Sequence, residues 1–190
     1  RIDENRIFLV GHSLGGMLAP RIEVQGGDYA GLIILAGTPR PLWEVIYEQN
    51  LQGLAMYVTN EEEKSKYLKQ VEEEYEKAKN LQDMMVFGMN GFYLKEMDEH
   101  RVPDLIPQID KPFLILQGED DFQVFADKDF LEWQMLLEDD EDATWISYPG
   151  LNHFFITSKG PAKGTVAEYE IPGQVDEQVI EDIAKWILNQ

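Results

Sequence analysis

The chain has 190 residues, of which 16 are Lys or Arg and 36 are Asp or Glu, so its formal net charge at pH 7 is −20. No basic stripe interrupts this acidity, which argues against a nucleic-acid-binding protein because phosphates need cationic side chains to attract them. The absence of Cys excludes a disulfide framework and a zinc finger, and no apolar run approaches the roughly 18 residues of a membrane span. Length and composition are those of one globular domain, and they leave the cellular compartment open.

Apolar runs and helical periodicity alternate along the chain. Residues 7–10, 31–37 and 111–118 form continuous apolar runs that predict strands buried on both faces. Between the first two runs, residues 14–24 carry apolar side chains at helical spacing. A strand, a helix and a second strand within about 30 residues predict a βαβ unit with parallel strands.

Two further elements complete the prediction of an α/β fold. Weak alternation at 143–148 predicts a fourth strand, and residues 175–188 carry an apolar stripe that predicts a closing helix. Strands that alternate with helices in this way indicate an α/β protein with a parallel sheet.

A segment between the second and third strands interrupts this alternation. It contains no strand-like run, and Thr59 with Glu62 forms a capping-box pattern ahead of one long amphipathic helix. We therefore expect residues 39–100 to be a helical insertion between two core segments, 1–38 and 101–190. Its acidic clusters are expected on solvated faces, because a metal site needs spaced ligands around a turn.

The strongest chemical signal is at residues 11–15, which match the pattern G-x-S-x-G directly after a predicted strand and directly before a predicted helix. In this context Ser13 lies on a strained turn that lifts its hydroxyl clear of the sheet, and we expect both flanking glycines to avoid backbone clashes. The start of the helix directs the N–H of Leu14 toward the same point, where it would stabilise an oxyanion. The alternative is a glycine-rich turn in which the serine has no chemical role.

A serine hydroxyl needs a base to become a nucleophile, and the chain has three histidines. His12 adjoins Ser13, where neighbouring side chains diverge, and His100 lies in a charged stretch before the third core strand. His153 follows the fourth predicted strand, at the same carboxyl edge of the sheet as Ser13. His153 is therefore the expected base, and the alternative is a loop histidine without a catalytic role.

The base needs a carboxylate that orients it, and after a serine elbow the acid precedes the histidine along the chain. Three adjacent acids, Glu119, Asp120 and Asp121, follow the third core strand. Chemistry alone does not choose among them, since any of the three can be a surface charge.

Three segments together resemble the α/β-hydrolase superfamily, and more narrowly the bacterial esterases and acyl-peptidase-like hydrolases related to dienelactone hydrolase. They are the elbow at 11–16, the acid loop at 116–124 and the histidine loop at 148–153. In such enzymes the acid loop typically has the pattern Gly-Glu-x-Asp-x-x-Val. The resemblance thus places the acid of a Ser–His–Asp triad on Asp121 and makes Asp120 the variable position.

The resemblance implies an α/β-hydrolase-like parallel sheet with strands five to eight only, and residues 39–100 as the helical cap that these families carry after strand six. In the resembled fold the elbow follows the fifth strand, whereas only about six residues precede the first strand here. The resemblance therefore implies that the amino-terminal half of the fold, which donates a second oxyanion amide, is missing or is supplied by a companion chain.

The insertion is rich in Met and aromatic side chains, which are suited to enclose an acyl or aryl group. The alternative for any one of them is packing of the cap. Residues adjacent to the triad members are better candidates for a pocket wall. The candidate pocket residues are His12, Phe122, Phe154, Trp43, Met85 and Phe92.

These residues predict a serine hydrolase that cleaves small-molecule carboxylic esters through an acyl-enzyme intermediate, without a cofactor or a metal. Ser13 is expected to attack the acyl carbon and His153 to move the proton, while Asp121 fixes the tautomer of the base. The triad alone does not choose the acyl acceptor, so an oligopeptidase-like or acyltransferase activity is the first alternative. A non-catalytic binding domain of the same fold is the second.

Overall fold

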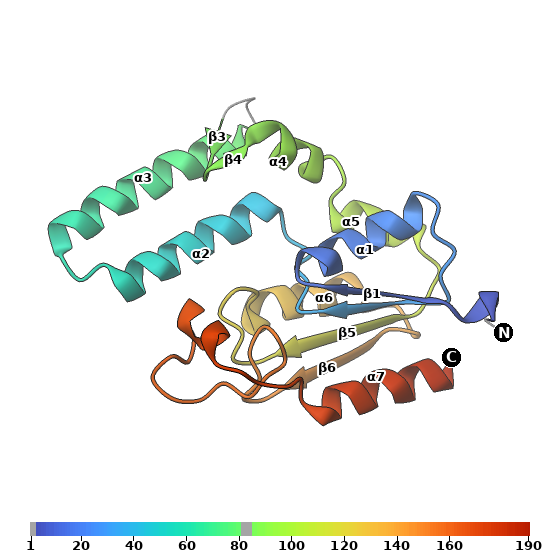
Figure 1. Cartoon of the computed structure of the whole chain (residues 1–190). Helices are drawn as coiled ribbons and strands as arrows, with labels where there is room; N and C mark the ends of the chain where they lie inside the picture. The colour runs from blue at the N-terminus through green and yellow to red at the C-terminus, as the bar shows by residue number, and fades with distance from the viewer. Residues whose placement is uncertain (1–2, 81–84) are drawn as a thin grey trace. The chain divides into compact units, whose positions relative to one another are not determined.

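The computed structural model describes residues 3–80 and 85–190 and divides into two compact units (Figure 1). The first unit consists of Arg1–Pro39 and Val102–Gln190, and the second of Arg40–Arg101. The second unit occupies the part of the chain where the sequence predicts an insertion.

The first unit contains a sheet of four parallel strands in the order β1–β2–β5–β6 (Figure 1). Because the strands are parallel, their carboxyl ends share one edge of the sheet. The predicted α/β class with a parallel sheet is confirmed. The strands are β1 (Phe8–His12), β2 (Gly31–Leu35), β5 (Phe113–Gly118) and β6 (Thr144–Tyr148).

Helices connect these strands and cover the sheet. The helix after the first strand and the helix near the end of the chain occur where the helical periodicity predicts them. The α-helices of this unit are α1 (Leu14–Val24), α5 (Val102–Leu105), α6 (Leu131–Leu136) and α7 (Glu177–Asn189). Its shorter turns are the 3₁₀ helices η1 (Glu4–Arg6), η2 (Ile106–Gln108) and η4 (Val166–Glu170) and the π-helical turn η3 (Ala126–Phe130).

The central strands are apolar throughout because both of their faces are covered. Ile33 belongs to a buried cluster that includes Val179 and Trp186 of α7. Its neighbour Ile34 points to the opposite face, where its Cγ2 would lie 3.0 Å from a Cβ placed on Gly16 of α1. A strand between two layers of helices needs a continuous apolar run rather than an alternating one.

The structure corrects the predicted ends of the first two strands. The first apolar run stops at Val10, but β1 continues through Gly11 to His12, which pairs with Leu35. The second strand ends at Leu35 because the next residue, Ala36, has a φ of 45°, outside the strand region. Ser13 therefore follows directly on a paired strand residue.

The second unit contains a short hairpin and three helices among its described residues. The expectation that this segment has no strand is wrong. Strands of two residues are too short to show an alternating pattern in the sequence, so the sequence does not predict them. The hairpin turns at Phe87 and Gly88, whose φ angles are 50° and 75°, as a two-residue turn requires. The elements are α2 (Leu42–Tyr57), α3 (Glu61–Lys79), β3 (Met85–Val86), β4 (Met89–Asn90) and α4 (Gly91–Asp98).

Helix α3 is the long amphipathic helix that the sequence predicts, although its cap differs by one residue. The Oδ1 of Asn60 accepts a hydrogen bond from the N–H of Glu63 at 3.0 Å, so Asn60 rather than Thr59 caps the helix. The end of the helix contributes to a small apolar core. The buried residues of that core are Ala78, Val86 and Leu94.

Candidate active site

Ser13 lies on a sharp turn between β1 and α1. Its φ of 55° and ψ of −120° lie outside the regions that residues with a side chain usually adopt. Its N–H donates to the carbonyl of Leu35 at 2.9 Å, which ties the turn to the next strand. Leu14 opens α1, so its N–H has no carbonyl acceptor within the helix. The turn thus presents a hydroxyl and a helix-start N–H from adjacent residues.

Close contacts explain two glycines of the turn but not a third. A Cβ added at Gly11 would lie 2.3 Å from the carbonyl oxygen of Gly15, and one added at Gly16 would lie 2.9 Å from the Cα of Gly37. A Cβ at Gly15 would meet no described atom within 4 Å outside its own helix backbone. The expectation that both glycines beside the serine prevent clashes is therefore correct for Gly11 and wrong for Gly15.

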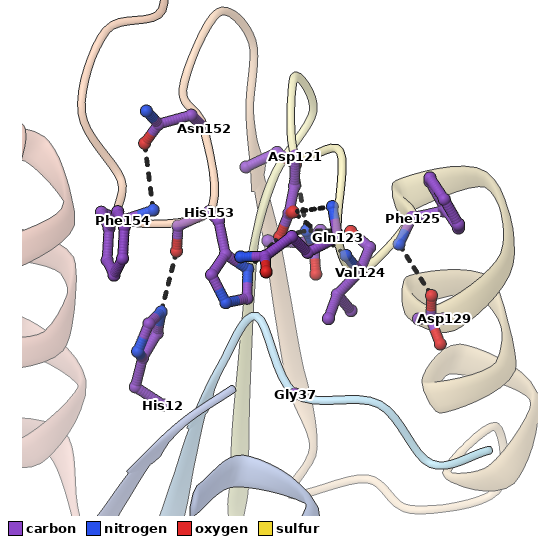
Figure 2. A network of polar contacts seen from close by, with 12 residues as sticks. His12, Gly37, Asp121, Gln123, Val124, Phe125, Asp129, Asn152, His153 and Phe154 are labelled. Carbon is purple, nitrogen blue, oxygen red and sulfur yellow. Dashed lines mark hydrogen bonds and ion pairs between the residues drawn. The ribbon is translucent and has the colours of Figure 1, made fainter. Parts of the chain in front are cut away.

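A buried hydrogen bond joins Asp121 to His153. The Oδ2 of Asp121 lies 2.7 Å from the Nδ1 of His153, and both residues are buried (Figure 2). The same carboxylate accepts hydrogen bonds from the N–H of Gln123 at 2.8 Å, the N–H of Val124 at 3.0 Å and the Nε2 of Gln117 at 3.1 Å. An ionised carboxylate only accepts, so Nδ1 of the histidine donates and its Nε2 is left to accept.

The neighbouring aspartate has a different partner. The Oδ2 of Asp120 lies 2.6 Å from the Nζ of Lys163, in an ion pair whose lysine is exposed. Two adjacent carboxylates thus face opposite surroundings, one a buried imidazole and the other a solvated ammonium. The burial of Asp121 and its contact with His153 distinguish it from Asp120 in a way that the sequence chemistry alone does not.

His153 lies on a tight turn that Asn152 holds from inside. The Oδ1 of Asn152 accepts hydrogen bonds from the N–H groups of Phe154 at 3.0 Å and Ile156 at 3.1 Å. The following residue, Phe155, is buried and has a φ of 58°, a conformation that a residue with a side chain adopts only when its surroundings enforce it. The main chain on both sides of the histidine is therefore fixed.

Gly118, the last residue of β5, brings the acid loop and the histidine loop into main-chain contact. A Cβ added at this position would lie 2.5 Å from the carbonyl oxygen of Leu151 and 2.6 Å from that of Asn152. Real Cβ atoms do not approach a backbone atom so closely, so the position requires glycine. The histidine loop therefore touches the strand end from which the loop of Asp121 begins.

His12 contacts the main chain of His153, although the sequence predicts no such contact. Its Nε2 lies 2.8 Å from the carbonyl oxygen of His153, and the centroids of the two imidazole rings are 4.8 Å apart (Figure 2). Burial is the main cause that lowers the pKa of His12 below its usual value, and the hydrogen bond to the carbonyl acts in the opposite direction. His12 was expected only as a pocket residue.

Aromatic side chains gather beside the histidine. The ring of Phe154 is 5.6 Å from that of His153 and 4.5 Å from that of Tyr169, which is in turn 5.4 Å from the ring of Phe122. A cavity of about 220 Å³ is lined in part by Phe154 and Tyr169. Both phenylalanines are pocket candidates predicted from the sequence, but Tyr169 is not, because it lies in the short 3₁₀ helix η4, where the sequence has no periodic signal.

The three pocket candidates of the insertion have varied surroundings within their own unit. Trp43 packs against the small core, and its Nε1 donates to the Oδ1 of Asp98 at 3.4 Å. Met85 is 61% exposed and Phe92 is 63% exposed. Trp43 therefore has a structural partner, while the pocket roles of all three stay predictions.

Hydrogen bonds connect some of the candidate residues but not all of them. The structure joins Asp121 to His153, and it joins His12 to His153. Within residues 3–80 and 85–190, it shows no hydrogen bond between the Ser13 hydroxyl and the His153 ring. A long or absent contact of this kind is common in catalytic sites without a bound substrate, because the bond tightens when the substrate binds.

No three His, Asp or Glu side chains lie in an arrangement that would hold a metal ion, in the part of the chain that the structure describes. Among the same residues, none of the helices has the length and apolar composition needed to cross a membrane.

Comparison with known proteins identifies a relative that matches almost the whole chain. No protein-family model matches the sequence. Esterase EstD of Thermotoga maritima is 32% identical over 191 aligned residues, which cover 99% of this chain and 44% of that protein. The chain thus spans less than half the length of its curated relative.

Solved structures of lower sequence identity share the fold. Est1E from Butyrivibrio proteoclasticus matches with a TM-score of 0.53 at 19% identity, over 96% of this chain and 61% of that one. An acylaminoacyl peptidase from Pyrococcus horikoshii matches with a TM-score of 0.50 at 14% identity, over 80% of this chain and 20% of that one. These structures show that the chain has the α/β-hydrolase fold. The resemblance that the three sequence motifs indicate is therefore confirmed.

Within this fold, the candidate residues come from three strand ends. Ser13 follows β1, Asp121 follows β5 and His153 follows β6. All three strands are parallel members of one sheet, so these residues emerge at its carboxyl edge.

Proposed function

We propose that this protein is a serine hydrolase that cleaves carboxylic esters of small molecules. The observation that carries the proposal is the buried hydrogen bond between Asp121 and His153 at 2.7 Å. A buried acid–base pair costs free energy to desolvate, and such pairs are concentrated at sites of proton transfer. Ser13, on its strained turn at the same sheet edge, supplies a nucleophile, and the similarity to a protein named as an esterase supports the choice of an ester bond.

In the proposed acylation step, the Oγ of Ser13 attacks the carbonyl carbon of the ester while its proton passes to the Nε2 of His153. The carbonyl oxygen becomes an oxyanion, to which the N–H of Leu14 donates. The bond between the acyl carbon and the alcohol oxygen then breaks, and the alcohol leaves with the proton from His153. The acyl group remains on Ser13.

In the proposed deacylation step, a water molecule attacks the acyl carbon and gives a proton to the Nε2 of His153. The bond between the acyl carbon and the Oγ of Ser13 breaks, and the histidine returns the proton to that oxygen. The carboxylic acid leaves, and the site is back in its starting protonation state. Neither step consumes an oxidant, a reductant or a cofactor.

Asp121 acts through His153 in this mechanism. Its carboxylate accepts the Nδ1 hydrogen, which selects the tautomer whose Nε2 can take a proton from Ser13. It also stabilises the imidazolium that forms during each step. The hydrogen bonds from Gln117, Gln123 and Val124 hold the carboxylate in place while it does so.

A fluorophosphonate probe tests the proposal, because it reacts with an activated serine and leaves ordinary serines unmodified. We expect the natural full-length protein to be labelled at Ser13 and to hydrolyse p-nitrophenyl esters. The Ser13→Ala variant is expected to be neither labelled nor active. A folded natural protein that is not labelled would favour the non-catalytic alternative.

The acyl acceptor and the type of bond need a separate comparison. Ester turnover well above the turnover of the matching anilide is expected for an esterase. Turnover of the anilide at a comparable rate would favour the oligopeptidase-like alternative, and acyl transfer to an added alcohol in preference to water would favour an acyltransferase.

A further inference from the structure

His12 links the serine turn directly to the main chain of the proposed base. It is the last residue of β1 and the residue immediately before Ser13. Its Nε2 lies 2.8 Å from the carbonyl oxygen of His153, which is 141 positions further along the chain. The side chain of His12 therefore connects the strand end next to the proposed nucleophile with the backbone of the proposed base.

The direction of this hydrogen bond follows from the chemistry of the acceptor. A carbonyl oxygen only accepts, so the Nε2 of His12 must carry the hydrogen. Burial lowers the pKa of His12, so the ring is neutral at neutral pH and its Nδ1 carries no hydrogen. A neutral ring here avoids a second positive charge 4.8 Å from the imidazole that takes up a proton in the proposed mechanism.

The two hydrogen bonds of His153 restrain different degrees of freedom. Asp121 binds the Nδ1 of the ring and so fixes its rotation about the side-chain torsions. His12 binds the carbonyl of the same residue and so fixes where its backbone lies. Because His12 is joined to Ser13 by one peptide bond, the backbone position that it fixes is set relative to the nucleophile.

The ring of His12 is itself held in place by aromatic contacts. Its centroid lies 5.6 Å from that of Phe154 and 4.8 Å from that of His153. These contacts limit the rotation of the ring, so the Nε2 hydrogen stays directed at the carbonyl.

We propose that His12 is a positioning residue, which sets the distance between Ser13 and His153 through its hydrogen bond to the carbonyl of His153. This inference rests on the proposed function, because it assigns the residue a role in the same reaction. Rates of reactions between oriented groups fall steeply when a group moves by a fraction of an ångström, so the loss of this bond should slow catalysis without removing a reacting atom.

Two substitutions separate the hydrogen bond from the volume of the ring. His12→Gln keeps an N–H donor at a similar distance from the backbone, whereas His12→Met fills a similar volume without a donor. His100→Met is the matched control, because it removes a histidine whose structural neighbour is Glu96 in the second unit. All variants are made in the natural full-length protein, and the concentration of competent sites is measured by titration with a fluorophosphonate.

We expect His12→Met to lower kcat per titrated site by about tenfold, the rate effect of losing roughly one hydrogen bond's worth of free energy, with KM within about twofold. His12→Gln is expected to recover most of the rate, and His100→Met to match the natural protein. A merely structural role of His12 would lower the number of titrated sites and leave kcat per site unchanged.

The outcomes distinguish this inference from the proposed function. A natural protein that neither reacts with the probe nor turns over an ester overturns the proposed function. An active natural protein whose His12→Met variant keeps its kcat, or whose His12→Gln variant is as slow as His12→Met, overturns the role of His12 alone. Nitrogen NMR of the imidazole rings gives a check that does not depend on activity: the Nε2–H tautomer of His12 supports the inference, and the Nδ1–H tautomer contradicts it.

Discussion

The two units of the chain use their side chains differently. In the first unit, the carboxylate of Asp121 receives hydrogen bonds from two backbone N–H groups, an amide and an imidazole. In the second, the ring of Tyr75 contacts the rings of Trp43 and Tyr47, and Trp43 also packs against the small apolar core. Hydrogen bonds with defined donors and acceptors indicate the chemical role of a residue, whereas packing between aromatic rings is compatible with many roles. Reactive groups can therefore be inferred residue by residue from their bonds, whereas the ring packing of the second unit does not assign a function to any one residue.

The largest effect is expected from removing the reacting groups. Ser13→Ala and His153→Ala should each lower ester turnover by roughly 10⁴-fold or more, and the double variant should be scarcely slower than either single variant, because the two act as a unit. Steady-state kinetics on purified, folded variants measure this. Substantial turnover by His153→Ala would show that His153 is not the base, and the contrast between the two units would no longer hold.

The adjacent aspartates provide the next test, because they differ in partner but not in chemistry. Asp121→Asn should lower kcat by roughly a thousandfold or more, since the amide can donate to Nδ1 and so favour the wrong tautomer. Asp120→Asn removes only an ion pair with an exposed lysine, and its kcat should change by less than about twofold. If the larger loss came from Asp120→Asn, the acid would be assigned to the wrong residue.

The glycines of the serine turn test whether its geometry is enforced by close contacts. Gly11→Ala would bring a methyl group 2.3 Å from a backbone oxygen, and we expect a loss of about 3 kcal/mol or more in the free energy of unfolding. Gly15→Ala has open space in a helix, and stability should be unchanged or rise by about 0.5–1 kcal/mol. Thermal unfolding followed by circular dichroism measures both. Equal losses would contradict the contact-based explanation.

The smallest effects are expected in the insertion. Trp43→Ala should cost about 2 kcal/mol of unfolding free energy because the indole packs against the core, whereas Phe92→Ala should change it by less than about 0.5 kcal/mol. A rise in KM for Phe92→Ala, without a change in stability, would support the predicted pocket role. An unchanged KM across a series of acyl chains would argue against it.

The fold of the first unit is predicted well by local patterns in the sequence. Buried parallel strands have a distinctive continuous apolar run, and α1 has the bounds that its periodicity predicts. The hairpin at Phe87 and Gly88 escapes prediction because its strands are two residues long. The cap of α3 is displaced by one residue because Thr59 and Asn60 are both good caps, and only the structure shows which side chain reaches the helix.

The candidate site is predicted less evenly. Ser13 and His153 follow from the motif and the order of elements, whereas Asp121 needed the resemblance to a family to distinguish it from Asp120. The hydrogen bond from His12 to the carbonyl of His153 joins residues 141 positions apart and involves a backbone atom, so no pattern of side chains in the sequence predicts it. Tyr169 was also not predicted, since its ring neighbours Phe122 and Phe154 come from two segments that are distant in the sequence.

The glycine at the end of β5 has a practical consequence for anyone who redesigns this site. At Gly118 two segments of the main chain are in contact. The distance between the acid loop and the histidine loop is therefore set by the backbone, and changing side chains does not adjust it. A library that varies the site should therefore keep residue 118 constant and place its diversity at Phe122 and Phe154. There, partly exposed rings can change size without moving the loops that carry them.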